Sequence, residues 1–288
     1  MPNQTREDEP FNALDAVRAS NFTEKSGPDR AIDLGFVDLQ AKGHDRPKKD
    51  EKYDLVTASS DSLASLPTPL TQYKRLDLDL YEFYSADLPD IWGANEGLVK
   101  VSVDTRDPQK IDGNPATAAF ATEFAVSDGD YAPSFLYRGI FRNVLFEEWV
   151  NLGFDLYEVD TDASVYYDKI KGVIDGVPEI KNLDVLKGIP YLNLATNLFD
   201  GIVRTFGKNP DDHLWGEIPL LEIDPLVGGA FLRSGIYVLF ERSSTSDSEV
   251  GVSSFNYLNG RLAPKDNAKL TNHLIIGIRV RAHESATA

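Results

Sequence analysis

From residue 72 onward the chain alternates apolar and polar residues with a period of two. Leu76, Leu78 and Leu80 alternate with Arg75 and Asp77, a pattern typical of a strand that buries one face. Similar segments, rich in Val, Phe or Tyr and separated by Gly, Pro, Asn and Asp, lie at residues 98–104, 117–126, 135–147, 153–159, 231–242, 250–257 and 273–281. The pattern therefore predicts eight strands, and Asn259-Gly260 after the seventh is a strong signal for a tight turn.

The segment between the fifth and sixth predicted strands has a different period. Leu194, Leu198, Ile202 and Phe206 recur every four residues, which indicates helix. We therefore expect a two-helix insertion at about residues 163–207. Short strands at this spacing favour a mainly β fold, an eight-stranded antiparallel β-sandwich, over a βαβ fold.

Residues 1–69 are polar, with many Asp, Glu, Lys, Ser and Pro residues. Such a composition offers too little apolar burial to offset the entropy lost on ordering. Two islands, 11–22 and 32–39, carry apolar residues near helical spacing and could dock on a partner or on the body of the chain. We therefore predict a disordered or partner-docking arm over 1–69 and a single domain over 70–288.

The charge balance is strongly acidic. The chain has 46 Asp and Glu against 29 Lys and Arg, a net charge of -17, so its field repels phosphate backbones and nucleic acid is not an expected partner. The chain contains no cysteine, which excludes disulfides, a thiol nucleophile and zinc sites of the Cys type. Stability must then come from packing.

The N-terminal sequence MPNQTREDEP lacks a basic segment followed by an apolar run, and no stretch of about 18 apolar residues occurs. These features predict a cytoplasmic protein. Export by a signal-independent machine, or loading into a phage-like particle, agrees equally with them.

Acidic residues follow two of the predicted strands. Asp90 and Glu96 flank the loop between the first and second strands, and Asp160, Asp162 and Asp168 follow the fifth. If both loops leave the same end of the sandwich, five carboxylates converge and repel one another unless a cation joins them. Carboxylate oxygens on loops, without His or Cys, suit calcium. The alternative is that these acids are solvated turn residues, because Asp favours turns.

The residues around these acids carry a family resemblance. Leu88-Pro89 precedes Asp90, a Val-Lys-Val strand follows Glu96, and an apolar strand runs into Asp160. Over about residues 73–171 the chain resembles the C2 domain, a calcium-dependent phospholipid-binding β-sandwich. The resemblance implies that the calcium ligands are Asp90, Glu96, Asp160, Asp162 and Asp168.

The chain departs from the C2 pattern at three points. Glu96 stands where the family usually has Asp, Glu96-Gly97-Leu98 replaces its usual Asp-Pro-Tyr, and the helical insertion has no counterpart in a compact member. The longer carboxylate changes the ligand radius and therefore the expected calcium affinity.

Apolar residues lie among the acids of both loops. They are Ile91, Trp92, Val165, Tyr166 and Tyr167, and as exposed tips they predict membrane contact, since Trp and Tyr favour the bilayer interface. Calcium would bridge the carboxylates to anionic phospholipid headgroups, whereas without it the negative charge opposes approach. The alternative is a satellite core against the insertion.

The sequence thus predicts a non-enzymatic, calcium-responsive phospholipid-binding module, cytoplasmic and peripherally membrane-associated. The second hypothesis is a structural or protein-interaction protein, namely a scaffold, particle component or secreted effector whose acidic loops bind no metal. A hydrolase with paired carboxylates is the third.

Overall fold

The computed structural model describes residues 32–86, 95–106, 115–133, 135–158, 213–217, 219–241, 251–266 and 268–283. These residues form mainly antiparallel β-sheets, which confirms the expected β class. The helices among them are three short 3-10 helices: η1 (Gln40–Lys42), η2 (Asp61–Ser65) and η6 (Val252–Ser254).

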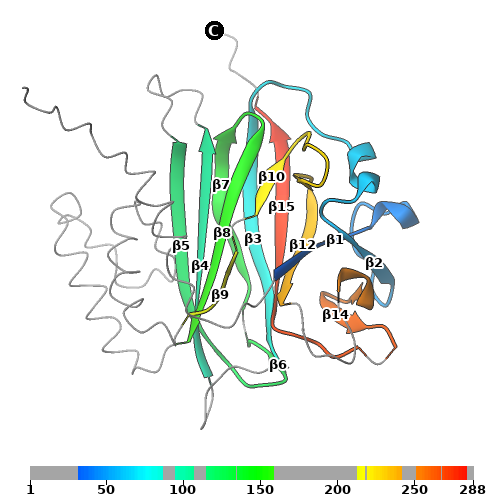
Figure 1. Ribbon diagram of the computed structural model, residues 1–288, viewed down its shortest axis with the longest axis vertical. Coiled ribbons are helices and arrows are strands. Elements are labelled where there is room, and N and C mark those ends of the chain that lie inside the picture. The colour runs from blue at the N-terminus through cyan, green and yellow to red at the C-terminus, as the bar shows by residue number, and fades with distance from the viewer. Residues whose placement is uncertain are drawn as a thin grey trace, which may run out of the picture.

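The larger sheet has nine strands, all paired antiparallel (Figure 1). Their order is β14 (Arg261–Pro264), β13 (Phe255–Leu258), β2 (Lys52–Thr57), β1 (Ile32–Val37), β12 (Gly235–Glu241), β15 (His273–Ala282), β3 (Lys74–Ser85) and β6 (Asp130–Tyr131), with β7 (Tyr137–Phe146) also pairing with β3.

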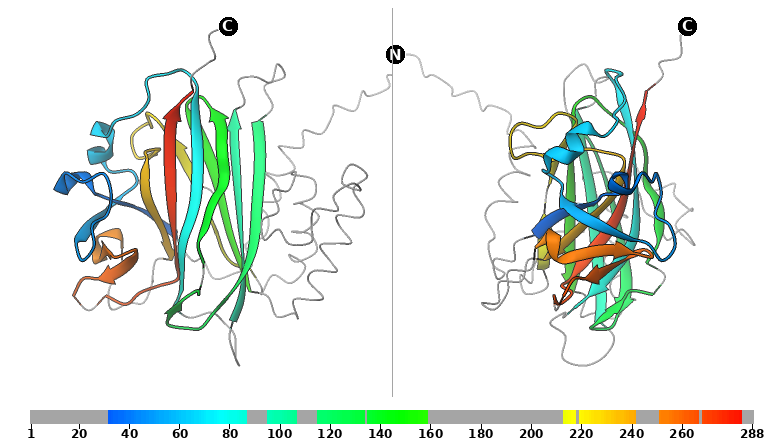
Figure 2. Two further views of the ribbon diagram at one scale, coloured as in Figure 1. Left: turned by 180° about the vertical axis from the view of Figure 1, so that it is seen from behind. Right: turned by 90° about the vertical axis from the view of Figure 1, so that its right-hand side faces the viewer.

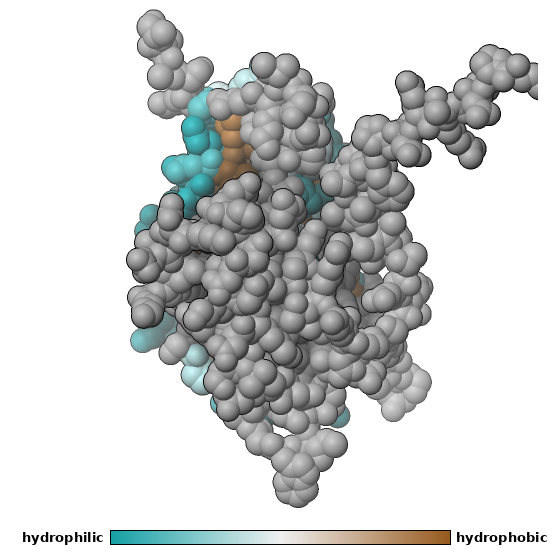
Figure 3. Space-filling model, turned by 90° about the vertical axis from the view of Figure 1, so that its left-hand side faces the viewer, coloured by the Kyte–Doolittle hydropathy of each residue, from teal (hydrophilic) through white to brown (hydrophobic). Residues whose placement is uncertain are grey.

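The smaller sheet has six strands. Their order is β11 (Ala230–Phe231), β10 (Leu220–Glu222), β8 (Trp149–Glu158), β4 (Asn95–Arg106) and β5 (Pro115–Val126), with β9 (His213–Glu217) also pairing with β8. Among the described strand pairs, β10–β11 alone is parallel. Viewed from the β5 side, the described surface includes a strip of apolar residues bordered by hydrophilic ones (Figure 3).

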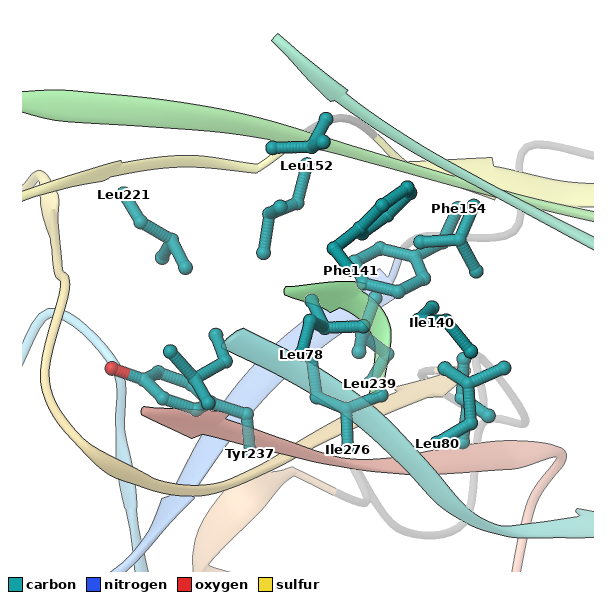
Figure 4. Packing of buried hydrophobic residues seen from close by; sticks show 14 of the residues in the cluster. Leu78, Leu80, Ile140, Phe141, Leu152, Phe154, Leu221, Tyr237, Leu239 and Ile276 are labelled. Carbon is teal, nitrogen blue, oxygen red and sulfur yellow. The ribbon is translucent and has the colours of Figure 1, made fainter. Parts of the chain in front are cut away.

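The main core lies between the facing sides of the two sheets. In Figure 4, Leu152 and Phe154 of β8 lie opposite Leu78 and Leu80 of β3 and Ile276 of β15, and each is at most 1% exposed. Each fully buried side chain of this size contributes about 1.5–3 kcal/mol. The period-two leucines of β3 therefore hold the two layers together.

A second core covers part of the outer side of the larger sheet. It includes Tyr53 of β2, Phe240 of β12 and Phe255 of β13, beneath the β13–β14 hairpin (Figure 2). The hairpin turns at Asn259 (φ 51°) and Gly260 (φ 92°), as a type I′ turn requires. The predicted tight turn is confirmed.

The predicted number of eight strands is too low. The described part alone contains a nine-stranded and a six-stranded sheet, and several of the additional strands are short, namely β6, β9, β10 and β11, with 2, 5, 3 and 2 residues respectively. Such segments do not show a recognisable period of two.

The predicted arm boundary at residue 69 is wrong for residues 32–69. In this segment β1 pairs with both β2 and β12, and Phe36, Tyr53 and Leu63 are 3%, 0% and 1% exposed. Their partners lie far along the chain, so local composition does not reveal them. Residues 1–31 lie outside the described part.

The expected two-helix insertion at 163–207 also lies outside the described residues. Within the described part, the structure contains no helix long and apolar enough to cross a bilayer.

Candidate functional site

The segments predicted to bind calcium are attached to neighbouring strands at one end of the smaller sheet. β4 begins at Asn95 and β8 ends at Glu158, and the two strands pair antiparallel with Gly97 opposite Glu158 (Figure 1). Adjacent strands lie about 4.8 Å apart. The point at which the chain passes from residues 87–94 into β4 is therefore close to the point at which it passes from β8 into residue 159.

Most of the predicted site residues lie outside the described part of the chain. They are Asp90, Ile91, Trp92, Asp160, Asp162, Val165, Tyr166, Tyr167 and Asp168. The backbone of Glu96 is placed in β4 opposite Ala125 of β5. The structure thus positions one of the five predicted ligands at this end of the sheet, by its backbone.

The last described residues before the first acidic loop are held by side chains from the segments that lead into β15 and β6. The Ala86 amide donates to Asn272 Oδ1 at 2.7 Å, and Asn272 Nδ2 donates to Glu241 Oε2 at 3.0 Å. Ser85 Oγ donates to Asp128 Oδ1 at 3.1 Å. These hydrogen bonds fix the position from which the chain enters residues 87–94.

The same end of the molecule carries acidic residues that the sequence reading did not single out. Asp128 lies in the turn between β5 and β6, Asp130 begins β6, Glu241 ends β12, and Glu158 ends β8. The sequence pattern that identified the other acidic loops, an acidic residue directly at the end of a strand, also applies to these residues. Among the described residues, however, no three His, Cys, Asp or Glu side chains are placed to hold a metal ion.

A fully buried histidine lies beside this end. His273 is 0% exposed and stacks on Tyr84 with ring centroids 5.0 Å apart, and Tyr131 packs edge-on against it. His273 Nδ1 lies 2.8 Å from the Thr271 carbonyl oxygen, and because a carbonyl only accepts, Nδ1 carries the proton. In the described part His273 Nε2 has no hydrogen-bond partner.

Comparison with protein-family models, with curated proteins and with solved structures finds no match. The function must therefore be inferred from the residues of this chain.

The burial of His273 leads us to expect that the stability of the folded chain depends on pH. Burial lowers the pKa of His273 from 6.5 to about 4, although the Thr271 carbonyl opposes the shift. Between these values the unfolded chain binds a proton that the folded chain does not. Stability is therefore full above pH 6.5 and falls as the pH drops toward 4, by about 3 kcal/mol at this site.

The measurement is urea unfolding of the wild type and of His273→Phe at pH 7 and pH 4. Phe keeps the ring stacked on Tyr84 but does not titrate, so the wild type should lose about 3 kcal/mol more than the variant between the two pH values. Equal losses would show that His273 is charged or solvated in the folded protein.

Proposed function

We propose that this chain is a calcium-responsive, non-enzymatic module with a C2-like sandwich that binds anionic phospholipid membranes. Asp90, Glu96, Asp160, Asp162 and Asp168 are the proposed calcium ligands. The observation that carries the proposal is the antiparallel pairing of Gly97 with Glu158, because it attaches both acidic segments to one end of one sheet.

Charge at this end supports a cation site. Asp128, Asp130 and Glu241 add negative charge close to the strand ends that carry the proposed ligands. Calcium takes six to eight oxygen ligands from flexible carboxylates and carbonyls. The bound ion lowers the mutual repulsion and provides the bridge to anionic headgroups, while Ile91, Trp92, Val165, Tyr166 and Tyr167 contact the bilayer interface.

Calcium is expected to raise the melting temperature of the full-length chain, because a ligand that binds only the folded state stabilises it, by about 2.7 kcal/mol at a concentration of 100 Kd. Calcium should also pellet the protein with phosphatidylserine-containing vesicles. Asp160→Asn with Asp162→Asn should remove both responses. Thermal melts and sedimentation with calcium or a chelator measure them.

Two control variants match this experiment. Asp45→Asn with Asp61→Asn makes the same charge change at exposed positions away from the strand ends and should keep both responses. Leu226→Ala with Val227→Ala alters exposed apolar residues beyond β10, whose Glu222 pairs with Trp149 at the opposite end of β8. Pelleting that survives the chelator, or that needs Leu226 and Val227, would contradict the proposal.

A second candidate function is protein interaction. Leu226 and Val227 are 87% and 108% exposed on the turn between β10 and β11, and two adjacent exposed apolar side chains favour contact with a partner. Absence of any calcium response in the melt would favour this function.

A further inference from the structure

The outer side of the larger sheet is divided into two parts. The second core covers β1, β2 and β12 and extends to Ile275 of β15 and Tyr81 of β3. The rest of this side of β7, β3 and β15, which faces the viewer in Figure 2, left, carries charged side chains. This second part, here called the arginine face, contains Arg75, Arg138, Arg142, Arg279 and Arg281 together with Asp77, Asp79 and Tyr81. Five arginines thus gather with two aspartates in a chain whose net charge is -17.

Asp77 fixes two of these arginines. It is 3% exposed, and it accepts from the Asn143 amide at 2.9 Å and from Arg281 at 2.7 Å, with Arg142 3.6 Å away. Burial alone would raise the pKa of Asp77, but the Asn143 amide and the guanidinium groups outweigh it and hold the pKa below its usual value. Asp77 is therefore an ionised anchor.

The neighbouring contacts fix the rest of the network. Asp79 Oδ1 accepts from Arg142 at 3.1 Å and from the Gly139 amide at 2.5 Å. Arg75 Nε donates to His283 Nδ1 at 3.1 Å. Three arginines, Arg75, Arg142 and Arg281, are thus paired within the chain.

Arg138 of β7 and Arg279 of β15 differ from the other three arginines in their lack of a partner among the described residues. Both are exposed, and neither has an ion-pair or hydrogen-bond partner in the part of the chain that the structure describes. Together with Arg142 they act electrostatically on the phenol of Tyr81. The Tyr81 ring lies across Gly277, where a Cβ would overlap it, and it also packs against the second core. Tyr81 therefore marks the border between the second core and the arginine face.

The spacing of the free arginines limits what they can bind. β7 and β15 pair with opposite edges of β3, so Arg138 and Arg279 arise from strands roughly 10 Å apart. Two carboxylates on an extended peptide can reach that separation, because each residue advances about 3.3 Å.

We propose that the arginine face binds an acidic, extended segment of a partner protein, whose carboxylates pair with Arg138 and Arg279. The residue types agree with a protein partner, since Arg and Tyr are enriched in protein interfaces and Lys is depleted. The guanidinium fork also matches a carboxylate. Screening over about 10 Å at 0.1 M salt limits repulsion from the rest of the acidic chain.

The test uses the full-length chain with a chelator present, so its result is independent of the calcium proposal. The probe is a labelled decapeptide of alternating Glu and Ser, and fluorescence anisotropy measures its affinity. Arg138→Glu with Arg279→Glu should weaken binding about ten-fold or more, because two attractive pairs become repulsive. Arg138→Lys with Arg279→Lys should weaken it less, because charge is kept and the fork is lost.

The matched control is Lys52→Glu with Lys269→Glu, which makes the same charge change at exposed positions outside the arginine face and should change affinity less than about two-fold. Equal weakening by both glutamate pairs would overturn the proposal. So would absence of peptide binding to the wild type, including the case in which pyrophosphate or phosphatidylserine vesicles bind instead.

Discussion

A chain that begins at residue 66 is expected not to fold. The truncation removes β1, β2 and η2, and with them Phe36, Val37, Tyr53 and Leu55, each 4% exposed or less. Four such side chains contribute about 6–12 kcal/mol on burial, which is comparable with the 5–15 kcal/mol total stability of a typical domain. β12 would also lose the partner with which it now pairs over five positions.

Circular dichroism and urea unfolding measure this effect. A second truncation that begins at residue 31 removes only residues outside the described part and serves as the control, so the difference between the two isolates residues 31–65. A cooperative transition at the control's midpoint in the shorter chain would show that β1 and β2 are dispensable.

Arg233→Met is expected to destabilise the folded chain by about 3–5 kcal/mol. Arg233 is 4% exposed, and it donates to the carbonyl oxygens of Leu63, Ile223 and Leu232 at 2.8, 2.8 and 2.9 Å. Its guanidinium also lies 4.7 Å from the centroid of the Phe231 ring. Met fills similar space but leaves buried carbonyls without this donor, and an unpaired buried acceptor is costly.

Urea unfolding at pH 7 gives the free-energy difference. The control is Arg279→Met, an exposed arginine without a partner among the described residues, which should change stability by less than about 0.5 kcal/mol. Arg233→Lys should lose less stability than Arg233→Met and more than Arg279→Met, because one ammonium group cannot reproduce the planar set of guanidinium donors. A loss below about 1 kcal/mol for Arg233→Met would mean that water replaces the guanidinium.

The long strands were predictable from the sequence. β3, β4, β5, β7, β8 and β15 each cover most of a segment identified by its alternation or its β-branched and aromatic content. A long strand with one buried face must alternate, so the signal accumulates along it. The short strands β6, β10 and β11 have 2 or 3 residues each, and their pairing is set by neighbours that local sequence does not specify.

Residues 32–57 show why composition misled at the N-terminal side. IDLGFV in β1 stands among polar residues, yet β1 pairs in the larger sheet between β2 and β12. The free energy that orders these residues comes from contacts some 200 positions away, such as Phe36 opposite Tyr237. A prediction based on local composition alone therefore underestimates the free energy that orders this segment.

The candidate sites show the same division. Acidic residues at strand ends could be identified along the chain, but only the pairing of β4 with β8 relates the two acidic segments in space. The arginine face had no signal, since Arg75, Arg138 and Arg279 lie in three distant segments. The pairing of β7 and β15 with β3 creates it.

The sequence by itself determined the β class, the acidic surface, the tight turn at Asn259-Gly260 and the leucines of the main core, because each depends on residues that are neighbours in the chain. Tertiary structure alone decided the place of β1, the burial of Arg233 and His273, and the gathering of arginines on one sheet face. Strand pairing brings together residues that no local pattern connects. Burial then sets the protonation state of a titratable side chain and the free energy of folding that is lost when the side chain is replaced.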